Sequence, residues 1–221
     1  MYRKYPRTPH APWSPGKTSD DVVITSFDNF KDKEIVVTEK IDGENSSLYT
    51  DHLHARSISS LHHPSRAWLK QKHAEIKHDI PEGWRICGEN VYAFHSIFYT
   101  SLPSYFLVFG IYDNNNICLS WDETLDFCQL IGLTPVPVLY RGKFDEALLK
   151  NLWKGKGAYP TFKDDVLKEE SEAEGYVVRI TDTFHYDDFN LNVFKYVREN
   201  HVQTDEHWLE KVVVPNQLKE I

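Results

Sequence analysis

The sequence predicts an α+β domain built on mainly antiparallel sheets. Its 221 residues, of which 41% are apolar and 14% aromatic, suffice for one sizeable hydrophobic core. Short runs of β-branched and aromatic residues recur along the chain, and turn residues separate them. Segments with helical periodicity are few and lie among these runs. Many strands with few interspersed helices favour antiparallel sheets with helices at the periphery.

Residues 1–20 are expected to form an extended arm ahead of the main domain, which we place at residues 21–221. The arm contains four prolines, and each fixes φ and prevents helix formation. They are Pro6, Pro9, Pro12 and Pro15. Basic and aromatic residues lie among the prolines, which would let the arm rest on the domain. A disordered tail is the alternative.

Beyond the arm, runs of β-branched and aromatic residues predict the strands. Turns are expected at Asp51-His52 and at residues 113–116, because Asp and Asn favour turn geometry. The predicted strands are residues 35–38, 46–50, 53–57, 84–91, 105–112, 117–120, 175–180 and 192–197.

Three helices are expected between these strands. A proline begins the first (residues 64–78), which places apolar residues on one side. Asp122 is expected to cap the second helix, and Gly132 to end it. The third has a stripe of leucines and ends near Gly155. Residues 155–173, rich in Gly and Lys and then acidic, predict a surface connection.

Charge and cysteine content limit the class of protein. A net charge of −8 argues against coating nucleic acid by charge alone, although a local basic groove remains possible. Three cysteines without a Cys-x-x-Cys pair predict free core thiols in a reduced, cytoplasmic protein. The chain has neither an apolar run long enough to span a membrane nor a signal-peptide pattern at its start. His52 and His54 would share one strand face, but no third ligand stands at a zinc-like spacing.

The most informative segment is residues 38–45, Thr-Glu-Lys-Ile-Asp-Gly-Glu-Asn. Four ionisable side chains gather at the end of a Val-rich strand, where a buried sheet normally excludes them. Lys40 can act as a nucleophile if its pKa falls; burial or nearby cations lower that pKa, whereas adjacent carboxylates resist the change. Gly43 permits a turn that brings the backbone close to a phosphate. A solvated hairpin end is the alternative interpretation.

Further segments place a charged or aromatic residue at or within a strand. Taken singly, each fits a core strand with a charge at its end. Together they have a fixed order: residues 56–57 (Arg-Ser), 87–90 (Cys-Gly-Glu-Asn), 106–113 (a strand with a central Phe), 174–178 (Glu-Gly-Tyr-Val-Val) and 193–198 (Val-Phe-Lys-Tyr-Val-Arg).

This series resembles motifs I, Ia, III, IIIa, IV and V of the covalent nucleotidyltransferases, which comprise polynucleotide ligases and mRNA capping enzymes. Among these it is most similar to the ATP-dependent RNA ligases that repair nicks in duplex RNA. Like that group, it has Glu39-Lys40 followed by Asn45 five residues after the lysine. The resemblance covers about residues 35–200. It implies an adenylation domain with two mainly antiparallel sheets around a nucleotide cleft.

The resemblance also implies a role for each motif residue. Lys40 would attack the α-phosphate of ATP and form lysyl-AMP. Glu174 would help to place Mg²⁺ or Mn²⁺, and Lys195 would bind the α-phosphate; with Lys40 these would be the catalytic residues. The other nucleotide-binding residues would be Glu39 beside the adenine, Asn45 around the nucleotide or RNA end, Arg56 on a phosphate, Glu89 on the ribose and Phe109 stacked on the adenine.

The implied activity is adenylation of the enzyme, transfer of AMP to an RNA 5′-phosphate, and attack by a 3′-hydroxyl. Its partners would be RNA ends, in a nicked duplex or a hairpin. A DNA-nick ligase with the same chemistry and a catalytically silent nucleotide- or RNA-binding module are the alternatives. Cations that could hold RNA are Arg3, Lys4, Arg7 and Lys17 in the arm, and Lys154, Lys156 and Lys163; ordinary solvated side chains are the competing interpretation.

The sequence departs from the family pattern in two places. Motif V normally has Lys-x-Lys, but Val197 occupies the second lysine position. Arg198, or a lysine from residues 155–168, could substitute. The chain also ends about twenty residues after motif V, so we expect no appended C-terminal domain.

Overall fold

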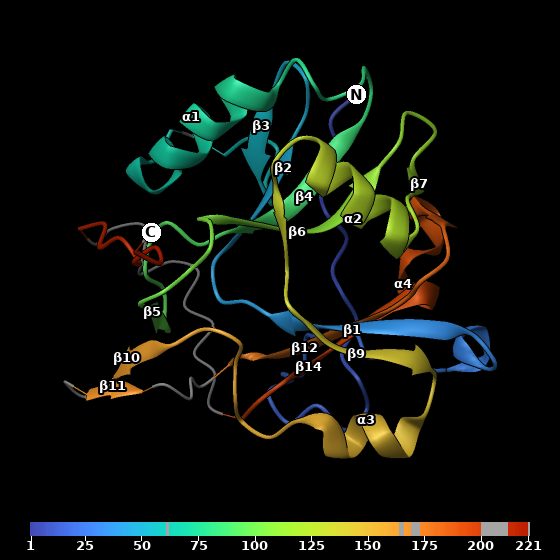
Figure 1. The fold of residues 1–221 in the computed structure, drawn as a ribbon. Coiled ribbons are helices and arrows are strands. Elements are labelled where there is room, and N and C mark those ends of the chain that lie inside the picture. Colours follow the sequence, from blue (N-terminus) through green and yellow to red (C-terminus); the bar gives the residue numbers. More distant parts are fainter. Residues whose placement is uncertain (61, 164–165, 169–172, 200–211, 221) are drawn as a thin grey trace.

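The computed structural model describes residues 1–60, 62–163, 166–168, 173–199 and 212–220 (Figure 1). Within these residues the strands form three sheets, and nearly all neighbouring strands are antiparallel. This arrangement confirms the predicted α+β class. In Figure 1 the two larger sheets lie one above the other, and the helices lie at the periphery.

The four-stranded sheet has the order β14-β12-β1-β9. Its strands are β1 (Glu34–Lys40), β9 (Val138–Lys143), β12 (Gly175–Ile180) and β14 (Val193–Val197). Side chains of β12 alternate in the expected way, so that Tyr176, Val178 and Ile180 enter one core while Val177 and Arg179 face the other side. Helix α3 (Glu146–Leu152) covers the first face through the buried Leu149.

The seven-stranded sheet has the order β13-β7-β6-β4-β2-β3, and β8 pairs in parallel with β6. Its strands are β2 (Glu44–Leu48), β3 (Leu53–Ala55), β4 (Arg85–Asn90), β6 (Phe106–Tyr112), β7 (Ile117–Cys118), β8 (Thr134–Pro135) and β13 (Phe184–His185). Helices α1 (Ala67–Ile76) and α2 (Trp121–Leu130) pack buried side chains against this sheet. The three cysteines are also buried, and their thiols are free.

The third sheet corrects the prediction that residues 155–173 are only a surface connection. Strands β10 (Thr161–Lys163) and β11 (Val166–Lys168) pair with each other, and β10 pairs with β5 (Phe98–Tyr99). These strands are too short for an alternating pattern, so their pairing across the fold decides their structure. The side chain of Lys163 lies outside the described residues.

Helix starts also differ from the expected positions. Ser120, rather than Asp122, caps α2: its Oγ accepts a hydrogen bond from the Glu123 amide, and the Glu123 carboxylate accepts one from the Ser120 amide. The proline-initiated helix begins as the 3₁₀ turn η2 (Pro64–Arg66) before α1. The remaining short helices are η1 (Asp28–Phe30), η3 (Tyr186–Asp188) and α4 (Phe189–Asn192).

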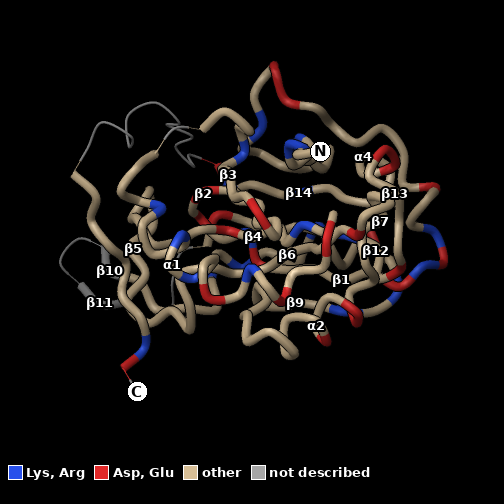
Figure 2. Tube along the Cα trace, turned by 90° about the horizontal axis from the view of Figure 1, so that it is seen from above, with Lys and Arg blue, Asp and Glu red and all other residues tan. Residues whose placement is uncertain are grey.

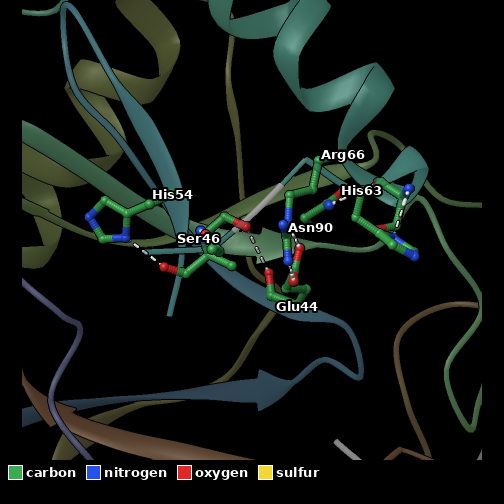
Figure 3. A network of polar contacts seen from close by, with 9 residues as sticks. Glu44, Ser46, His54, His63, Arg66 and Asn90 are labelled. Atoms are coloured by element: carbon green, nitrogen blue, oxygen red, sulfur yellow. Dashed lines mark hydrogen bonds and ion pairs between the residues drawn. The ribbon is translucent and has the colours of Figure 1, made fainter. Parts of the chain in front are cut away.

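A buried ion pair braces the start of β2 against η2. Arg66 Nε donates to Glu44 Oε2 at 2.7 Å, and the side chains are only 8% and 9% exposed. Asn90 lies beside them and donates to the Ser65 carbonyl (Figure 3). This network ties the segment after Lys40 to the neighbouring strand β4 and to helix α1.

The N-terminal arm crosses from the seven-stranded to the four-stranded sheet, as the dark-blue trace of Figure 1 shows. It begins at the β2–β3 turn, where the Tyr2 hydroxyl donates to Asp51 and the Arg3 amide donates to Tyr49. It ends beside β14, where His10 forms a parallel bridge with Lys195. Of the two interpretations of the arm, the structure shows the docked one.

No helix in the described part of the chain is long and apolar enough to cross a membrane. Along the described trace, basic and acidic residues are interspersed (Figure 2).

Candidate active site

A cavity of about 260 Å³ is lined by residues of both large sheets. Seven of the predicted site residues line it: Glu39, Lys40, Asn45, Arg56, Glu89, Phe109 and Lys195. Glu174, the eighth, is buried and reaches the site through a contact with Lys40. Residues spread over most of the chain therefore converge on one cavity.

Lys40 is the last residue of β1, where it pairs with Gly175 of β12. Its Nζ donates to Glu174 Oε2 at 2.5 Å, and the two side chains are 24% and 3% exposed. Burial by itself lowers the pKa of Lys40, but the carboxylates of Glu174, Glu89 and Asp42 outweigh burial and raise this pKa above its usual value. Lys40 is therefore an ammonium ion in this state, and a nucleophilic role requires that its proton be removed.

Lys195 lies on the same face of the four-stranded sheet, two strands away from β1. It pairs with Val177 of β12, which in turn pairs with Thr38 of β1. Burial, and after it the positive charge of Lys40, lower the pKa of Lys195 to about 8. An arriving anion would stabilise the charged form of Lys195, so the side chain is suited to bind a phosphate.

His10 of the arm packs beside Lys195 and is fully buried. Burial lowers the pKa of His10 to about 4, and the Lys195 charge acts in the same direction. The ring is therefore neutral at pH 7 and adds no positive charge next to Lys195. Its Nδ1 lies 2.9 Å from Ser14 Oγ, and its Nε2 lies 3.5 Å from Asp21 Oδ2.

Glu39 is almost completely buried, although it lines the cavity. Its Oε2 accepts a hydrogen bond of 2.6 Å from the Ala158 amide, whereas its Oε1 has no partner among the described residues. Burial raises the pKa of Glu39 to about 7, against the lowering effect of the Ala158 amide. A buried carboxyl oxygen without a partner is costly unless a ligand donates to it.

The seven-stranded sheet supplies the opposite wall of the cavity. Asn45 of β2 pairs with Glu89 of β4, and Asn45 Oδ1 is another buried oxygen without a described partner. Burial raises the pKa of Glu89 to about 8, although Lys40 lowers it. Phe109 of β6 contributes an aromatic surface, and Arg56 is exposed just beyond the end of β3.

Two motif glycines are explained by close packing. A Cβ on Gly43 would lie 2.6 Å from the Asn90 carbonyl oxygen, and one on Gly175 would overlap the Tyr196 carbonyl. Gly43 does not have the positive φ that a glycine-specific turn would need. The expected approach of its backbone to a phosphate is therefore not what requires glycine here; the approach of β4 is.

Asp42 anchors the site from behind. Its Oδ2 accepts hydrogen bonds from the Ser96 amide, the Ser96 hydroxyl and the Ile97 amide, all at 2.8 Å. It thereby fixes the segment between β4 and β5 to the turn that follows Lys40. The sequence predicted a charged cluster here but not this positioning contact.

The structure also shows lining residues that the sequence analysis missed. They include Tyr5, Pro6, Arg7 and Thr8 of the arm, Asp21 directly after it, and Arg179 of β12. Tyr5 packs edge-on against Phe109 with ring centroids 4.9 Å apart. The prolines and the basic and aromatic residues of the arm predict an extended segment, but they do not specify where it docks.

Solved RNA ligases share this architecture. A Naegleria gruberi RNA ligase with pyrophosphate matches with a TM-score of 0.53 at 18% identity, over 86% of this chain and 58% of that one. A mutant of the same enzyme with ATP and Mn matches with a TM-score of 0.51 at 17% identity, over 86% and 61%. An archaeal ATP-dependent RNA ligase gives 0.53 at 16% identity, over 89% and 48%. These likenesses show that the chain shares the fold of solved RNA ligases.

The family follows from the sequence profile of the RNA ligases, which matches residues 33–197 and so includes every predicted site residue. The chain belongs to the RNA ligase family. It spans at most about three-fifths of the length of the solved ligases compared above. No curated protein matches the sequence at a significant level.

Proposed function

We propose that this protein is an ATP-dependent RNA ligase that forms a lysyl-AMP intermediate on Lys40. The observation that carries the proposal is the position of the Lys40 ammonium, at a cavity of about 260 Å³ and 2.5 Å from the Glu174 carboxylate. Membership of the RNA ligase family and the ATP and Mn in a structural neighbour support the choice of nucleotide, metal and substrate.

The first step forms a bond between Lys40 Nζ and the α-phosphorus and breaks the bond from that phosphorus to the bridging oxygen, so that pyrophosphate leaves with the electron pair. Lys40 must first lose a proton, and Glu174 Oε2 is placed to accept it. Lys195 and Arg56 would neutralise the charge that develops on the phosphate oxygens. Glu39 Oε1 and Asn45 Oδ1 are acceptors without described partners, suited to the amino group of adenine and to hydroxyls.

Carboxylates at the site fit a magnesium or manganese ion. Glu174 and Glu89 are hard oxygen donors, which these ions prefer, and the ions keep several waters or phosphate oxygens as further ligands. Within the described residues no three His, Cys, Asp or Glu side chains are grouped to hold a metal by themselves, so phosphate oxygens would complete the coordination. When bound, the ion supplies positive charge that shields the phosphates and lowers the pKa of Lys40.

Incubation with labelled ATP, GTP or NAD and a divalent metal, followed by denaturing electrophoresis, tests the first step. We expect label from ATP alone, in wild type and in Lys143→Ala, which changes an exposed lysine of the same sheet. Lys40→Ala should remain folded and take no label. An acid-labile label that persists in Lys40→Ala would refute the assignment, and the absence of any label would favour a silent binding module.

The proposed RNA substrate has ends that are already aligned. With an overall charge of −8, binding would depend on a small local groove and few phosphates. Pairing of the strands would then supply the proximity that the protein surface does not. Sealing of a nicked RNA duplex should exceed sealing of the same strands unpaired, at two salt concentrations. Equal joining of unpaired strands at high salt would contradict this substrate class, and preferential sealing of nicked DNA would favour a DNA ligase.

A further inference from the structure

Val197 stands where the family pattern has a second lysine, and the arm covers it. Its side chain is fully buried, its amide donates to Ser14 Oγ at 2.9 Å, and its carbonyl accepts from the Gly16 amide at 3.0 Å. A longer, charged side chain at this position would have to displace the arm. The arm therefore occupies the space that a lysine at position 197 would need. The positive charge of that lysine would have to come from another residue.

The cations that line the cavity, among the described residues, are Arg7, Lys40, Arg56, Arg179 and Lys195. Of the substitutes suggested by the sequence, Arg198 and Lys156 are not among them, and the side chains of Lys163 and Lys168 lie outside the described residues. Arg198 also follows Val197 directly, so it points to the opposite side of an extended strand from Lys195.

Arg179 is already committed to the protein. Its Nη2 donates to the Leu119 carbonyl at 2.7 Å, and its Nε donates to the Ile180 carbonyl at 3.1 Å. Its guanidinium also lies near the rings of Trp121 and Phe184. Lys40 is the proposed nucleophile, and Lys195 and Arg56 have predicted phosphate roles. Among the described cations that line the cavity, Arg7 therefore remains to supply the missing charge.

The exposed fractions of these side chains indicate how deep each cation lies in the cavity. Lys195 is half-buried and Arg7 is exposed. The arm fixes their separation, because the Lys195 amide donates to the Pro9 carbonyl at 2.8 Å. Arg7 precedes Pro9 by two residues, roughly 6–7 Å of extended chain. A triphosphate that enters with its α-phosphate at Lys195 would therefore place its outer phosphates near Arg7.

We propose that Arg7 of the N-terminal arm binds the β- and γ-phosphates of ATP, and so carries the charge that Val197 cannot supply. The inference rests on the proposed function. Arg7 Nη1 makes a single described hydrogen bond, 3.1 Å to the Asp20 carbonyl, and its planar fork suits two phosphate oxygens. The neighbouring carboxylate of Asp21 is held by the Thr18 amide and hydroxyl, which offsets part of its repulsion.

This role concerns the leaving group. When Lys40 Nζ bonds to the α-phosphorus, the electron pair of the broken bond moves to pyrophosphate, and Arg7 neutralises the growing charge. In the reverse direction Arg7 would hold the attacking pyrophosphate. Once lysyl-AMP has formed and pyrophosphate has left, Arg7 has no further part in sealing.

In reactions that contain ATP or pyrophosphate but no RNA, the test first compares Arg7→Ala with Lys4→Ala, which removes an exposed cation of the same arm that does not line the cavity. Arg7→Ala should slow lysyl-AMP formation at limiting ATP by about tenfold or more. It should slow the re-formation of ATP from lysyl-AMP and added pyrophosphate to a similar degree. Sealing of RNA that already carries 5′-AMP should stay within about twofold of wild type. Arg7→Lys should recover part of the loss, and thermal unfolding should show that every variant is folded.

A binding measurement separates this inference from the proposed function. In a Lys40→Ala background, adding Arg7→Ala should weaken ATP binding and spare AMP binding. Equal behaviour of Arg7→Ala and Lys4→Ala would overturn the inference and leave lysyl-AMP chemistry intact. So would a loss confined to sealing of pre-adenylated RNA, which would make Arg7 an RNA contact. Failure of the wild type to form lysyl-AMP would overturn the proposed function, while a selective loss of ATP binding would still support a phosphate role for Arg7.

Discussion

The two sheets that line the cavity contribute different kinds of group. The four-stranded sheet brings two lysines and the two acids Glu39 and Glu174, all at or beside strands of one continuous ladder. The seven-stranded sheet brings Asn45, Glu89 and Phe109. The first wall therefore carries most of the groups proposed for phosphate chemistry, together with Glu39 for the adenine. The second carries most of those proposed for recognising a nucleoside, together with Arg56 for a phosphate.

The two walls are also held differently. Register places Lys40 and Lys195 on one face, because β12 pairs with both β1 and β14. Glu174 also holds the Lys40 ammonium, and the arm is hydrogen-bonded to the backbone of Lys195. The opposite wall is braced by the buried pair of Glu44 and Arg66 (Figure 3). Changes to the first wall should therefore affect chemistry more than stability, and changes to the brace should do the reverse.

The largest expected effect is on stability. Arg66→Ala leaves the Glu44 carboxylate buried without its partner, which should lower the free energy of unfolding by about 3–5 kcal/mol. The matched control is Arg141→Ala, which breaks the exposed pairs with Glu34 and Asp122 on the four-stranded sheet. That change should cost about 1 kcal/mol or less. Denaturant unfolding measures both, and equal losses would contradict the contrast between the walls.

The next effect is on chemistry. Lys195→Ala should slow lysyl-AMP formation on the order of 10²-fold, about 3 kcal/mol, because a cation directed at the phosphate is lost. Lys143→Ala, an exposed lysine on β9 of the same sheet, should react at the wild-type rate. Single-turnover labelling with ATP gives both rates. If the two variants react equally fast, Lys195 does not contact the phosphate.

A smaller effect appears in the pH dependence of stability. The pKa of Glu89 is raised by burial to about 8, so its folded form holds a proton that its unfolded form releases at lower pH. The resulting stabilisation is complete at low pH and is lost as pH rises towards 8. Glu89→Gln has no such loss, so its stability relative to wild type should increase from pH 5 to pH 9. Because the Glu89 side chain is only partly buried, we expect this increase in relative stability to be about 2 kcal/mol.

The control for this measurement is Glu82→Gln, which changes an exposed carboxylate. Its stability relative to wild type should stay nearly constant over the same pH range. A Glu89→Gln variant that loses stability relative to wild type at high pH would mean that the carboxylate is stabilised by its neighbours rather than penalised by burial.

The smallest effect concerns helix α2. Ser120→Ala removes the cap and should cost about 1 kcal/mol of stability. Asp122→Ala, at the position that the sequence suggested as the cap, removes only an exposed partner of Arg141 and should cost less. Thermal unfolding of the two variants compares them. A larger loss for Asp122→Ala would restore the original assignment of the cap.

The strands that carry site residues could be predicted because their signals are local. Residues 35–38 and 106–112 alternate or cluster apolar side chains, and glycines mark where strands approach closely. Seven of eight predicted residues consequently line one cavity. Their roles in catalysis stay predictions, as does the division of the chain at residue 20.

What the sequence did not predict depends on non-local contacts. Strands β5, β10 and β13 have two or three residues each, and only their partners make them strands. The net direction of the Lys40 pKa shift required knowing that Glu174, distant in sequence, lies against its ammonium. No sequence motif indicates that the arm docks next to Lys195. The sequence therefore did not predict that Tyr5, Arg7 and Asp21 line the cavity.

The docked arm also has a consequence for the order of folding. Ser14 and its partner Val197 are 183 residues apart in the chain, so this part of the arm can dock only after β14, the last described strand, has been made. Contacts of such high sequence separation form slowly, because closing a long loop costs entropy before the contact stabilises it. We therefore expect the edge of the cavity beside Lys195 to be completed late in folding.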